Sequence, residues 1–592
     1  MRSAISGRRL WTLHLIITVL FLIVTYQLFQ LMLIRRPALL ELAAKQHGLR
    51  IAIPPLRGQI LDRNSKELAT NLKIPSVYAV PRVLPKAEIE PLARKLQSIL
   101  GLSPEFLRNR LSRDKAFIWL KRKVEPEEAL QIEQLKSPAL GIIKEYKRLY
   151  PQGDLLAHII GFTNVDSQGL EGLELYLSRD LQGRPGSRLT KRDAFGREIR
   201  AFEIRQIPAV DGHSVTLTVD QYLQYLTEDA LEKAFKTWKA LGATAILMEA
   251  KTGKILAMAS RPTFDPNRYS QAEPASRRNR AITDMYEPGS VFKIVAASAV
   301  LNENKVTPQD TFDCEQGAWD YGSRVLHDVH PYGRLSFEDV IVKSSNIGTV
   351  KIAQRLDPET LHAYIRGFGF GVPTGIDLPG EASGYVRPPK EWSATSPYNI
   401  PIGQEVMVTA LHMTAAMAVI ANGGELVKPY IISRITDQAG VVLQEKKPVI
   451  KRRVIRPEVA ETMRRILVRA VEEGTGKSAR IKGITVGGKT GTAQKVLPNG
   501  RGYSHSNFMA SFIGFAPAED PQYVMGVVLD DPRPMYYGGV VAAPVFKEVM
   551  EVALLSKGYV PYHAQEIKDG VLQTPAESQR ILPPPQGAGR GL

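Results

Sequence analysis

The sequence predicts a multidomain α+β protein with one N-terminal transmembrane helix, an elongated β-rich domain and a larger domain that mixes helices and strands. A chain of 592 residues is too long for a single domain. Residues 10–34 form a long run without charged side chains, which predicts the membrane helix. Short alternating strands and charged helical stretches follow this run. A second domain, which mixes helices and strands, begins near residue 212.

The uncharged run is long enough to cross a bilayer. Leu10 to Ile34 contains no Asp, Glu, Lys or Arg, and at about 1.5 Å per residue it exceeds the roughly 30 Å of bilayer hydrocarbon. No small-x-small cleavage site follows, because Arg35-Arg36-Pro37 comes next. We therefore expect an uncleaved anchor, preceded by a cytoplasmic tail at residues 1–9. Basic residues on the two sides nearly balance, so the positive-inside rule hardly discriminates between orientations.

Composition divides the rest of the chain into three parts. Residues 35–212 contain no recognisable nucleophile constellation and predict a non-catalytic pedestal, which ends in a hinge at Pro208–Gly212. Residues 213–555 predict the catalytic domain. Residues 556–592, with three consecutive prolines and several glycines, predict a disordered tail.

Three short patterns stand in order along the predicted catalytic domain. They are Ser290-Val-Phe-Lys293, Ser344-Ser345-Asn346 and Lys489-Thr490-Gly491-Thr492. This is the order S-x-x-K, S-x-N, K-T-G of penicillin-recognising serine acyl-transferases. Two further copies, Ser112-Arg-Asp-Lys115 and Lys251-Thr252-Gly253, do not fit the order; we interpret the first as a surface pattern and the second as a hairpin turn.

The first pattern suits nucleophilic catalysis. Ser290 follows a Pro-Gly turn and precedes an apolar run, so it begins a buried helix. Lys293 lies three residues on, where its amine can lie beside the serine hydroxyl. A lysine takes a serine proton only if burial or a second cation lowers its pKa, and Lys489 could be that cation. The alternative is a helix cap with a surface lysine.

The other two patterns suit proton relay and substrate binding. The Ser344 hydroxyl could pass a proton towards a leaving amine, while the Asn346 amide holds Lys293 or a substrate carbonyl; alone, the pattern would favour an ordinary helix cap. Ile484-Thr485-Val486 predicts a strand entering the K-T-G pattern. The edge of that strand, formed by Lys489, Thr490, Gly491 and Thr492, suits a substrate carboxylate. Backbone N–H groups of Ser290 and Thr492 are candidate oxyanion donors.

The residues around these patterns resemble one family. The sequence is similar to class B penicillin-binding proteins, the monofunctional peptidoglycan D,D-transpeptidases, and most of all to their cell-division (FtsI) type. In the predicted catalytic domain the resemblance rests on Arg261–Asn267, Arg280–Ser290, Gly403-Gln404 and Tyr536–Pro544. In the pedestal it rests on Arg57–Arg63, Arg148–Pro151 and Gly161–Gly172. Two departures are Asn64-Ser65, where the family usually has Asn-Gly, and Pro401-Ile402 before Gly403.

The resemblance implies a fold and an activity. It implies a transpeptidase domain in which helices sandwich an antiparallel sheet. Ser290 would attack the penultimate D-Ala carbonyl of a peptidoglycan stem peptide, and an amine of a neighbouring stem would release the acyl-enzyme. No metal or organic cofactor is implied. Because this substrate lies outside the cytoplasmic membrane, the resemblance also implies a single-pass inner-membrane protein with an extracytoplasmic catalytic domain.

The resemblance further implies partners, and leaves alternatives open. Expected partners are stem peptides, β-lactam inhibitors, membrane lipid, a polytopic glycan polymerase and divisome proteins. An elongation or sporulation enzyme, a β-lactamase or β-lactam sensor, and a divisome scaffold with a vestigial site remain alternatives. A bifunctional synthase is disfavoured because no glycosyltransferase acidic motif precedes residue 212.

Charge does not favour a nucleic-acid partner. The net charge is +17, but no basic stripe alternates with aromatic residues. The densest basic run, at residues 446–453, favours a solvated hairpin loop over a surface that attracts anionic lipid or wall polymer. His residues and the single cysteine, Cys314, show no metal-ligand spacing, and one cysteine excludes an internal disulfide.

Overall fold

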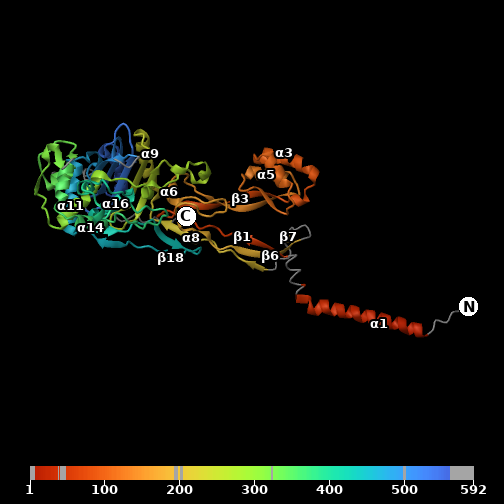
Figure 1. The fold of residues 1–592 in the computed structure, drawn as a ribbon. Coiled ribbons are helices and arrows are strands. Elements are labelled where there is room, and N and C mark those ends of the chain that lie inside the picture. Colours follow the sequence, from red (N-terminus) through yellow and green to blue (C-terminus); the bar gives the residue numbers. More distant parts are fainter. Residues whose placement is uncertain are drawn as a thin grey trace, which may run out of the picture.

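The computed structural model describes residues 7–37, 39, 48–192, 198–199, 205–321, 324–497 and 502–559. The N-terminal helix α1 (Gly7–Phe29) continues as a π-helical turn at Gln30–Ile34 and projects away from the rest of the protein (Figure 1). Helix α1 therefore begins before Leu10 and includes the last residues of the predicted tail. Arg9–Ile34 is the one described helix long and apolar enough to span a membrane, with mean hydropathy 2.1 and none of it buried.

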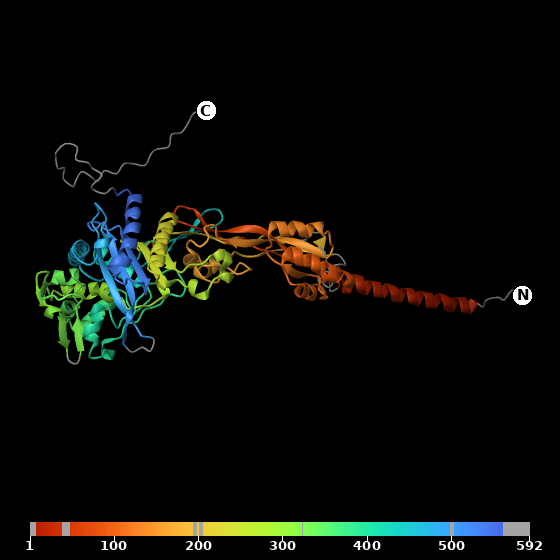
Figure 2. The same ribbon diagram turned by 90° about the horizontal axis from the view of Figure 1, so that it is seen from above.

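The pedestal consists of two sheets and a group of helices. Strand β3 (Glu67–Ala79) pairs with β4 (Ile118–Lys121) and β5 (Leu140–Leu149). Helices α3 (Ile89–Leu100), α4 (Pro104–Leu111) and α5 (Pro126–Gln134) form with these strands a separate apolar core. A second sheet contains β1 (Gly48–Ile53), β6 (Gly186–Arg192), β7 (Glu198–Ile199) and β8 (Arg205–Ile207). Figure 2 shows the resulting elongated shape between α1 and the catalytic domain.

Strands from both parts of the chain meet in one sheet. Its order is β18-β17-β9-β2-β3-β4, with β5 also paired to β3. The strands at the junction are β2 (Ile60–Leu61), β9 (Ser214–Leu217), β17 (Ile432–Thr436) and β18 (Val442–Glu445). One apolar cluster continues from Ile60 and Leu68 into the catalytic domain. The pedestal and the catalytic domain are therefore packed together.

The segment predicted as a hinge forms hydrogen bonds with neighbouring segments. Arg184 and Val210 exchange backbone hydrogen bonds, and the Gly212 N–H donates to the Leu56 carbonyl at 2.8 Å. The Leu56 N–H donates to the Asp211 carboxylate at 2.7 Å. These bonds tie the end of the segment to the pedestal, and a hinge at Pro208–Gly212 stays a prediction.

A five-stranded antiparallel sheet forms the centre of the catalytic domain. Its order is β11-β10-β22-β21-β20, which places the K-T-G strand at an edge. The strands are β10 (Gly242–Glu249), β11 (Ile255–Arg261), β20 (Gly487–Val496), β21 (Tyr503–Ala516) and β22 (Tyr523–Asp530). The resemblance implied such a sheet between helices, and this is confirmed.

Side chains alternate across this sheet, as a strand requires. Ala245 and Leu247 belong to the apolar cluster formed with α9 (Gln221–Thr237) and α19 (Ala543–Ser556). Ile246 and Met248 belong to the opposite cluster, formed with α11 (Lys293–Asn302) and α16 (Ala410–Ala421).

Smaller elements complete the catalytic domain. The short helices are α10 (Arg280–Thr283), α12 (Phe337–Val342), α13 (Asn346–Ala353), α14 (Pro358–Gly367), α15 (Ser396–Asn399) and α18 (Gly538–Val541), and the long α17 spans Pro457–Glu472. Paired short strands are β12 (Thr311–Asp313) with β15 (Arg334–Ser336), β13 (Ala318–Tyr321) with β14 (Arg324–His327), and β16 (Glu425–Val427) with β19 (Ile450–Arg453).

Two local predictions need correction, and one lies outside the description. Ile484–Val486 is not a strand; β20 begins at Gly487 and contains the K-T-G pattern itself. The basic run is no hairpin, because β18 before it pairs with β17 while β19 pairs with β16. Helix α19 ends at Ser556, and residues 560–592 of the predicted tail lie outside the described residues.

Two of the stretches that carry the pedestal resemblance meet at one buried carboxylate, that of Glu174, which follows the third stretch by two residues. Glu174 accepts hydrogen bonds from Nε of Arg57 at 2.5 Å and from Nε of Arg148 at 2.6 Å, and all three side chains are at most 2% exposed. Arg57 also donates to the Glu174 and Ser167 carbonyls. The cluster ties the strand region near β2 to the short helix α7 (Gly172–Tyr176).

Replacing Glu174 should strongly destabilise the pedestal. Glu174→Ala leaves two buried guanidinium groups without their carboxylate, which costs about 3–5 kcal/mol. Thermal unfolding of the detergent-solubilised protein would measure this as a large fall in melting temperature. Arg82→Ala, which removes an exposed ion pair with Asp114, is the control and should change it little. Equal melting temperatures for the two variants would contradict the structural role of Glu174.

Candidate active site

Ser290 begins the buried helix that the sequence predicts. A 3₁₀ turn at Gly289–Phe292 runs directly into α11, whose residues from Lys293 to Leu301 are all buried. Gly289 has φ +58°, and a Cβ there would come within 2.9 Å of the Ala493 side chain on β20. The glycine therefore lets the serine turn pack directly against the K-T-G strand.

Gly403 packs directly against this turn. Its carbonyl accepts the Gly289 N–H at 3.0 Å. Gly403 has φ +84°, and a Cβ would lie 2.2 Å from the Gly289 carbonyl oxygen. The preceding Pro401 and Ile402 are buried in a short 3₁₀ turn that ends at Gly403. The departure from the family pattern at these two positions is thus accommodated without displacing Gly403.

Lys293 contacts the second pattern. Its Nζ donates to the Ser344 carbonyl at 2.7 Å and to Oδ1 of Asn346 at 2.8 Å, and lies 3.3 Å from Oγ of Ser344. Lys489 approaches the same hydroxyl from the edge strand, with its Nζ 2.8 Å from Oγ of Ser344. One hydroxyl therefore lies between two lysine amines.

Backbone conformation separates the roles of the two adjacent serines. Ser345 is the N-cap of α13, and its Oγ accepts the Gly348 N–H at 2.9 Å. The helix cap that the sequence left as an alternative is thus Ser345. Ser344 has φ +61°, a left-handed conformation that is uncommon outside glycine. This conformation accompanies the placement of its side chain between the lysines, and such strain is typical of functional positions.

The hydroxyls of the K-T-G pattern contact neighbouring loops. Oγ1 of Thr490 lies 2.5 Å from Oγ1 of Thr475, which follows α17. Oγ1 of Thr492 accepts the Gly538 N–H at 3.3 Å. A Cβ on Gly538 would lie 2.1 Å from the Ser511 carbonyl oxygen of β21 and 2.5 Å from the Gly491 carbonyl oxygen of β20. Glycine at this position therefore lets the Tyr536–Pro544 stretch pack closely against both strands.

Burial depresses the pKa of both lysines. Lys293 is 0% exposed and Lys489 is 1% exposed. Desolvation lowers the pKa of Lys489 to about 7. Desolvation and the neighbouring charge of Lys489 lower the pKa of Lys293 well below its ordinary value. Both effects shift Lys293 towards the neutral amine.

The sequence reasoning missed two polar residues near these patterns. Thr475 carries no motif, and only the fold brings it to Thr490. Glu287 lies three residues before Ser290; its Oε1 accepts the Glu405 N–H at 2.9 Å and the Tyr503 hydroxyl at 3.3 Å. Burial raises the pKa of Glu287 to about 7. Its place in the resembling stretch was the one available indication.

The two pattern copies excluded by chain order lie away from the site. Lys251 occupies the exposed turn between β10 and β11 and pairs with Asp520, as predicted. Ser112 is exposed at the end of α4 in the pedestal.

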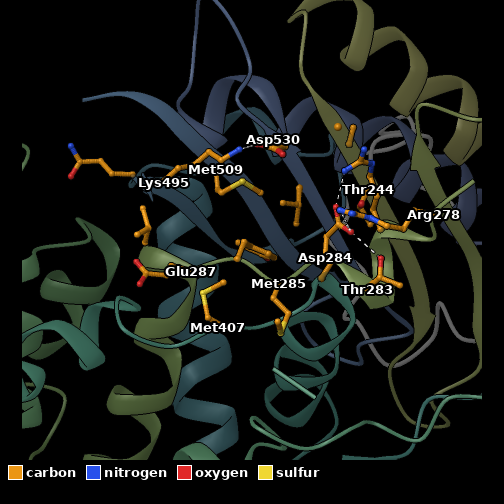
Figure 3. A pocket seen from close by; sticks show the side chains of 18 residues that line it. Thr244, Arg278, Thr283, Asp284, Met285, Glu287, Met407, Lys495, Met509 and Asp530 are labelled. Atoms are coloured by element: carbon orange, nitrogen blue, oxygen red, sulfur yellow. Dashed lines mark hydrogen bonds and ion pairs between the residues drawn. The ribbon is translucent and has the colours of Figure 1, made fainter. Parts of the chain in front are cut away.

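A cavity of about 470 Å³ lies next to the site, at one end of the central sheet. Figure 3 shows Glu287 and Met407 on one side of it and Arg278, Thr283 and Asp284 on the other. Asp284 pairs with Arg278 at 2.8 Å and with Arg280 at 2.7 Å. None of the eight predicted site residues lines this cavity. Among the described residues, no group of three or more His, Cys, Asp or Glu side chains could hold a metal ion.

Known families match both large parts of the chain. Residues 243–551 match the family described as "Penicillin binding protein transpeptidase domain", and residues 52–217 match the "Penicillin-binding Protein dimerisation domain". The fold and these matches define a serine acyl-transferase of the penicillin-binding class.

Individual relatives cover most of the chain. Stage V sporulation protein D of Bacillus subtilis is 36% identical over 94% of this chain and 86% of its own length. Peptidoglycan D,D-transpeptidase FtsI of Escherichia coli is 32% identical over 89% of this chain and 88% of its own length. The ampicillin complex of penicillin-binding protein 3 from Mycobacterium tuberculosis superposes with a TM-score of 0.68 and 30% identity, over 86% of this chain and 97% of that one. The chain belongs to the class B penicillin-binding proteins and is a peptidoglycan D,D-transpeptidase.

The two K-T-G copies provide a matched pair of variants. Lys489→Ala removes a charge-assisted contact worth roughly 1.5–3 kcal/mol, so acylation should slow by about one to two powers of ten. Lys251→Ala removes an exposed turn residue and should have little effect. Acylation rates with a β-lactam carboxylate and with its methyl ester measure the difference. Lys489→Ala should lose most of the preference for the free carboxylate; loss of that preference in Lys251→Ala instead would contradict the site.

Proposed function

We propose that Ser290 is the acylated nucleophile and Lys293 its general base. The observation that carries this proposal is the Ser344 hydroxyl between two buried lysine amines. A serine hydroxyl needs a base to become nucleophilic, and Lys293 has the burial and the neighbouring cation that a neutral lysine requires. Its place three residues after Ser290 brings the two side chains to the same helix start.

The contacts of Lys293 suit the neutral amine. A neutral amine has two N–H donors and one lone pair. The Ser344 carbonyl and Oδ1 of Asn346 accept the two donors. The lone pair then accepts the proton of Ser290 as Oγ attacks the penultimate D-Ala carbonyl. By accepting one of these donors, Asn346 orients the amine so that its lone pair can face Ser290.

Ser344 and Lys489 complete the first half-reaction. The Ser344 hydroxyl relays the proton from Lys293 to the nitrogen of the terminal D-Ala, whose C–N bond breaks as the ester to Ser290 forms. Lys489, with Thr490, Gly491 and Thr492, binds the terminal carboxylate. The N–H groups of Ser290 and Thr492 stabilise the oxyanion. In the second half-reaction the amine of a neighbouring stem peptide attacks the ester, and Ser290 recovers its proton.

We further propose a role in septal wall synthesis. The Gly161–Gly172 and Tyr536–Pro544 stretches, which resemble the cell-division type, favour this role. The identity to a sporulation protein supports sporulation as the second candidate. α1 anchors the enzyme in the cytoplasmic membrane, with the catalytic domain outside, where stem peptides occur. A polytopic glycan polymerase and divisome proteins are its partners, and β-lactams are inhibitors because they mimic the D-Ala-D-Ala end.

Peptide mapping after penicillin treatment tests the nucleophile. We expect one penicilloyl adduct, on the peptide that contains Ser290, and none in Ser290→Ala. Ser112→Ala is the matched control, because it alters the other S-x-x-K, and it should be acylated at the wild-type rate. An adduct that survives in Ser290→Ala would overturn the assignment.

Labelling of growing cells tests orientation and role together. A charged fluorescent β-lactam that does not cross the cytoplasmic membrane should label the full-length protein from outside, at the division septum, and should not label Ser290→Ala. Labelling only after the membrane is permeabilised would contradict the orientation. Signal along the lateral wall or around the forespore would contradict the septal role.

A further inference from the structure

Asp328 is a charged residue next to the site that no sequence pattern singles out. It follows β14 in the chain, sixteen or more residues before the S-x-N pattern, and its side chain lies against the start of α13. It is partly buried, and its neighbours on both sides in sequence are exposed. Its carboxylate therefore points inward from an otherwise exposed loop.

The carboxylate accepts hydrogen bonds from Ser345 and Asn346 of the S-x-N pattern and from the residue that follows it. Oδ1 accepts the Asn346 N–H at 2.5 Å and the Ile347 N–H at 3.1 Å. Oδ2 accepts the Ser345 hydroxyl at 2.5 Å. The first N–H groups of a helix have no partner within it, and a carboxylate there also interacts favourably with the helix dipole. Asp328 thus fixes the helix start from which Ser344 and Asn346 project.

The residue before Asp328 fixes the side chain of Asn346. The His327 carbonyl accepts Nδ2 of Asn346 at 2.9 Å. This contact turns the amide so that Oδ1 faces Nζ of Lys293. The two-residue segment His327-Asp328 therefore determines both the backbone position of Asn346 and the direction of its amide.

We propose that Asp328 is a positioning residue for the transpeptidase reaction, which holds Ser344 and Asn346 at the distances from the two lysines that proton transfer requires. The inference rests on the roles proposed above for Ser290 and Lys293. A displacement of about 1 Å at such a site can reduce a rate about 100-fold, so the anchoring carboxylate should matter to rate far more than to stability.

Asp328 also acts on Lys293 through its charge. The charged and titratable groups that face Lys293 are Lys489 from β20, Asp328 from the loop after β14, and Cys314 after β12. Lys489 lowers the pKa of Lys293, whereas Asp328 and Cys314 raise it. Removing the negative charge of Asp328 should therefore lower this pKa further. The neutral base then persists to lower pH, and the acidic limb of the acylation profile moves to lower pH.

Three variants of the full-length protein test the proposal. Asp328→Ala removes both anchoring and charge. Asp328→Asn keeps an oxygen that can accept the two backbone N–H groups but removes the charge. Asp357→Ala is the matched control: Asp357 caps α14 through the Thr360 N–H at 2.7 Å and the Thr360 hydroxyl at 2.8 Å, with no contact to the site. Acylation by a chromogenic β-lactam is measured against pH, together with the melting temperature.

We expect Asp328→Ala to acylate about 10- to 100-fold more slowly than wild type, with a fall in melting temperature no larger than that of Asp357→Ala. Asp328→Asn should recover most of the rate and show its acidic limb at lower pH. Asp357→Ala should acylate like wild type. If Asp328→Ala does not fold, the pH profile of acylation by Asp328→Asn tests the proposal by itself.

Two results would overturn the inference: an Asp328→Ala rate equal to that of Asp357→Ala, or an Asp328→Asn acidic limb that coincides with that of wild type. The failure of the proposed function is distinguishable from both, because it appears first in the wild-type protein as an adduct on a residue other than Ser290.

Discussion

The active site depends on burying two lysine amines around one hydroxyl. An ammonium group is costly to remove from water, and two of them a few ångströms apart in an apolar setting cannot both stay charged. Burial and the charge of Lys489 lower the pKa of Lys293, whose amine donates to the carbonyl of Ser344 and to the amide oxygen of Asn346. A lowered pKa favours the neutral amine that the proposed general base needs, so desolvation that opposes stability would serve catalysis.

This arrangement needs three elements from distant parts of the chain to remain in register. Helix α11 carries Lys293, the start of α13 carries Ser344, and the edge strand β20 carries Lys489. Close backbone approaches set their spacing: Gly289 lies against Ala493, and Gly403 against Gly289. Side chains at either glycine would force these elements apart. Gly289 and Gly403 therefore set the spacing between the elements that carry the three patterns.

The pedestal also contains buried charged side chains, and there they stabilise the assembly of separate segments. Glu174 and its two arginines are buried as an ion-paired cluster, which fixes how separate segments assemble. The sheet that joins β2 to β9 and β17 then makes the pedestal continuous with the catalytic domain.

The sequence by itself determined the order of the three patterns, the membrane helix and the antiparallel sheet between helices, because these depend on local chemistry, apolar length and family resemblance. It distinguished Lys489 from Lys251 by chain order alone. Tertiary structure decided the rest. The left-handed backbone at Ser344, the capping role of Ser345 and the contacts of Asp328 and Thr475 arise from packing between segments far apart in sequence. Pro208–Gly212 has the composition of a hinge, and only the fold shows that it forms backbone hydrogen bonds with Arg184 and Leu56. Composition reports what a segment can do alone, and only the fold supplies the partners that limit it.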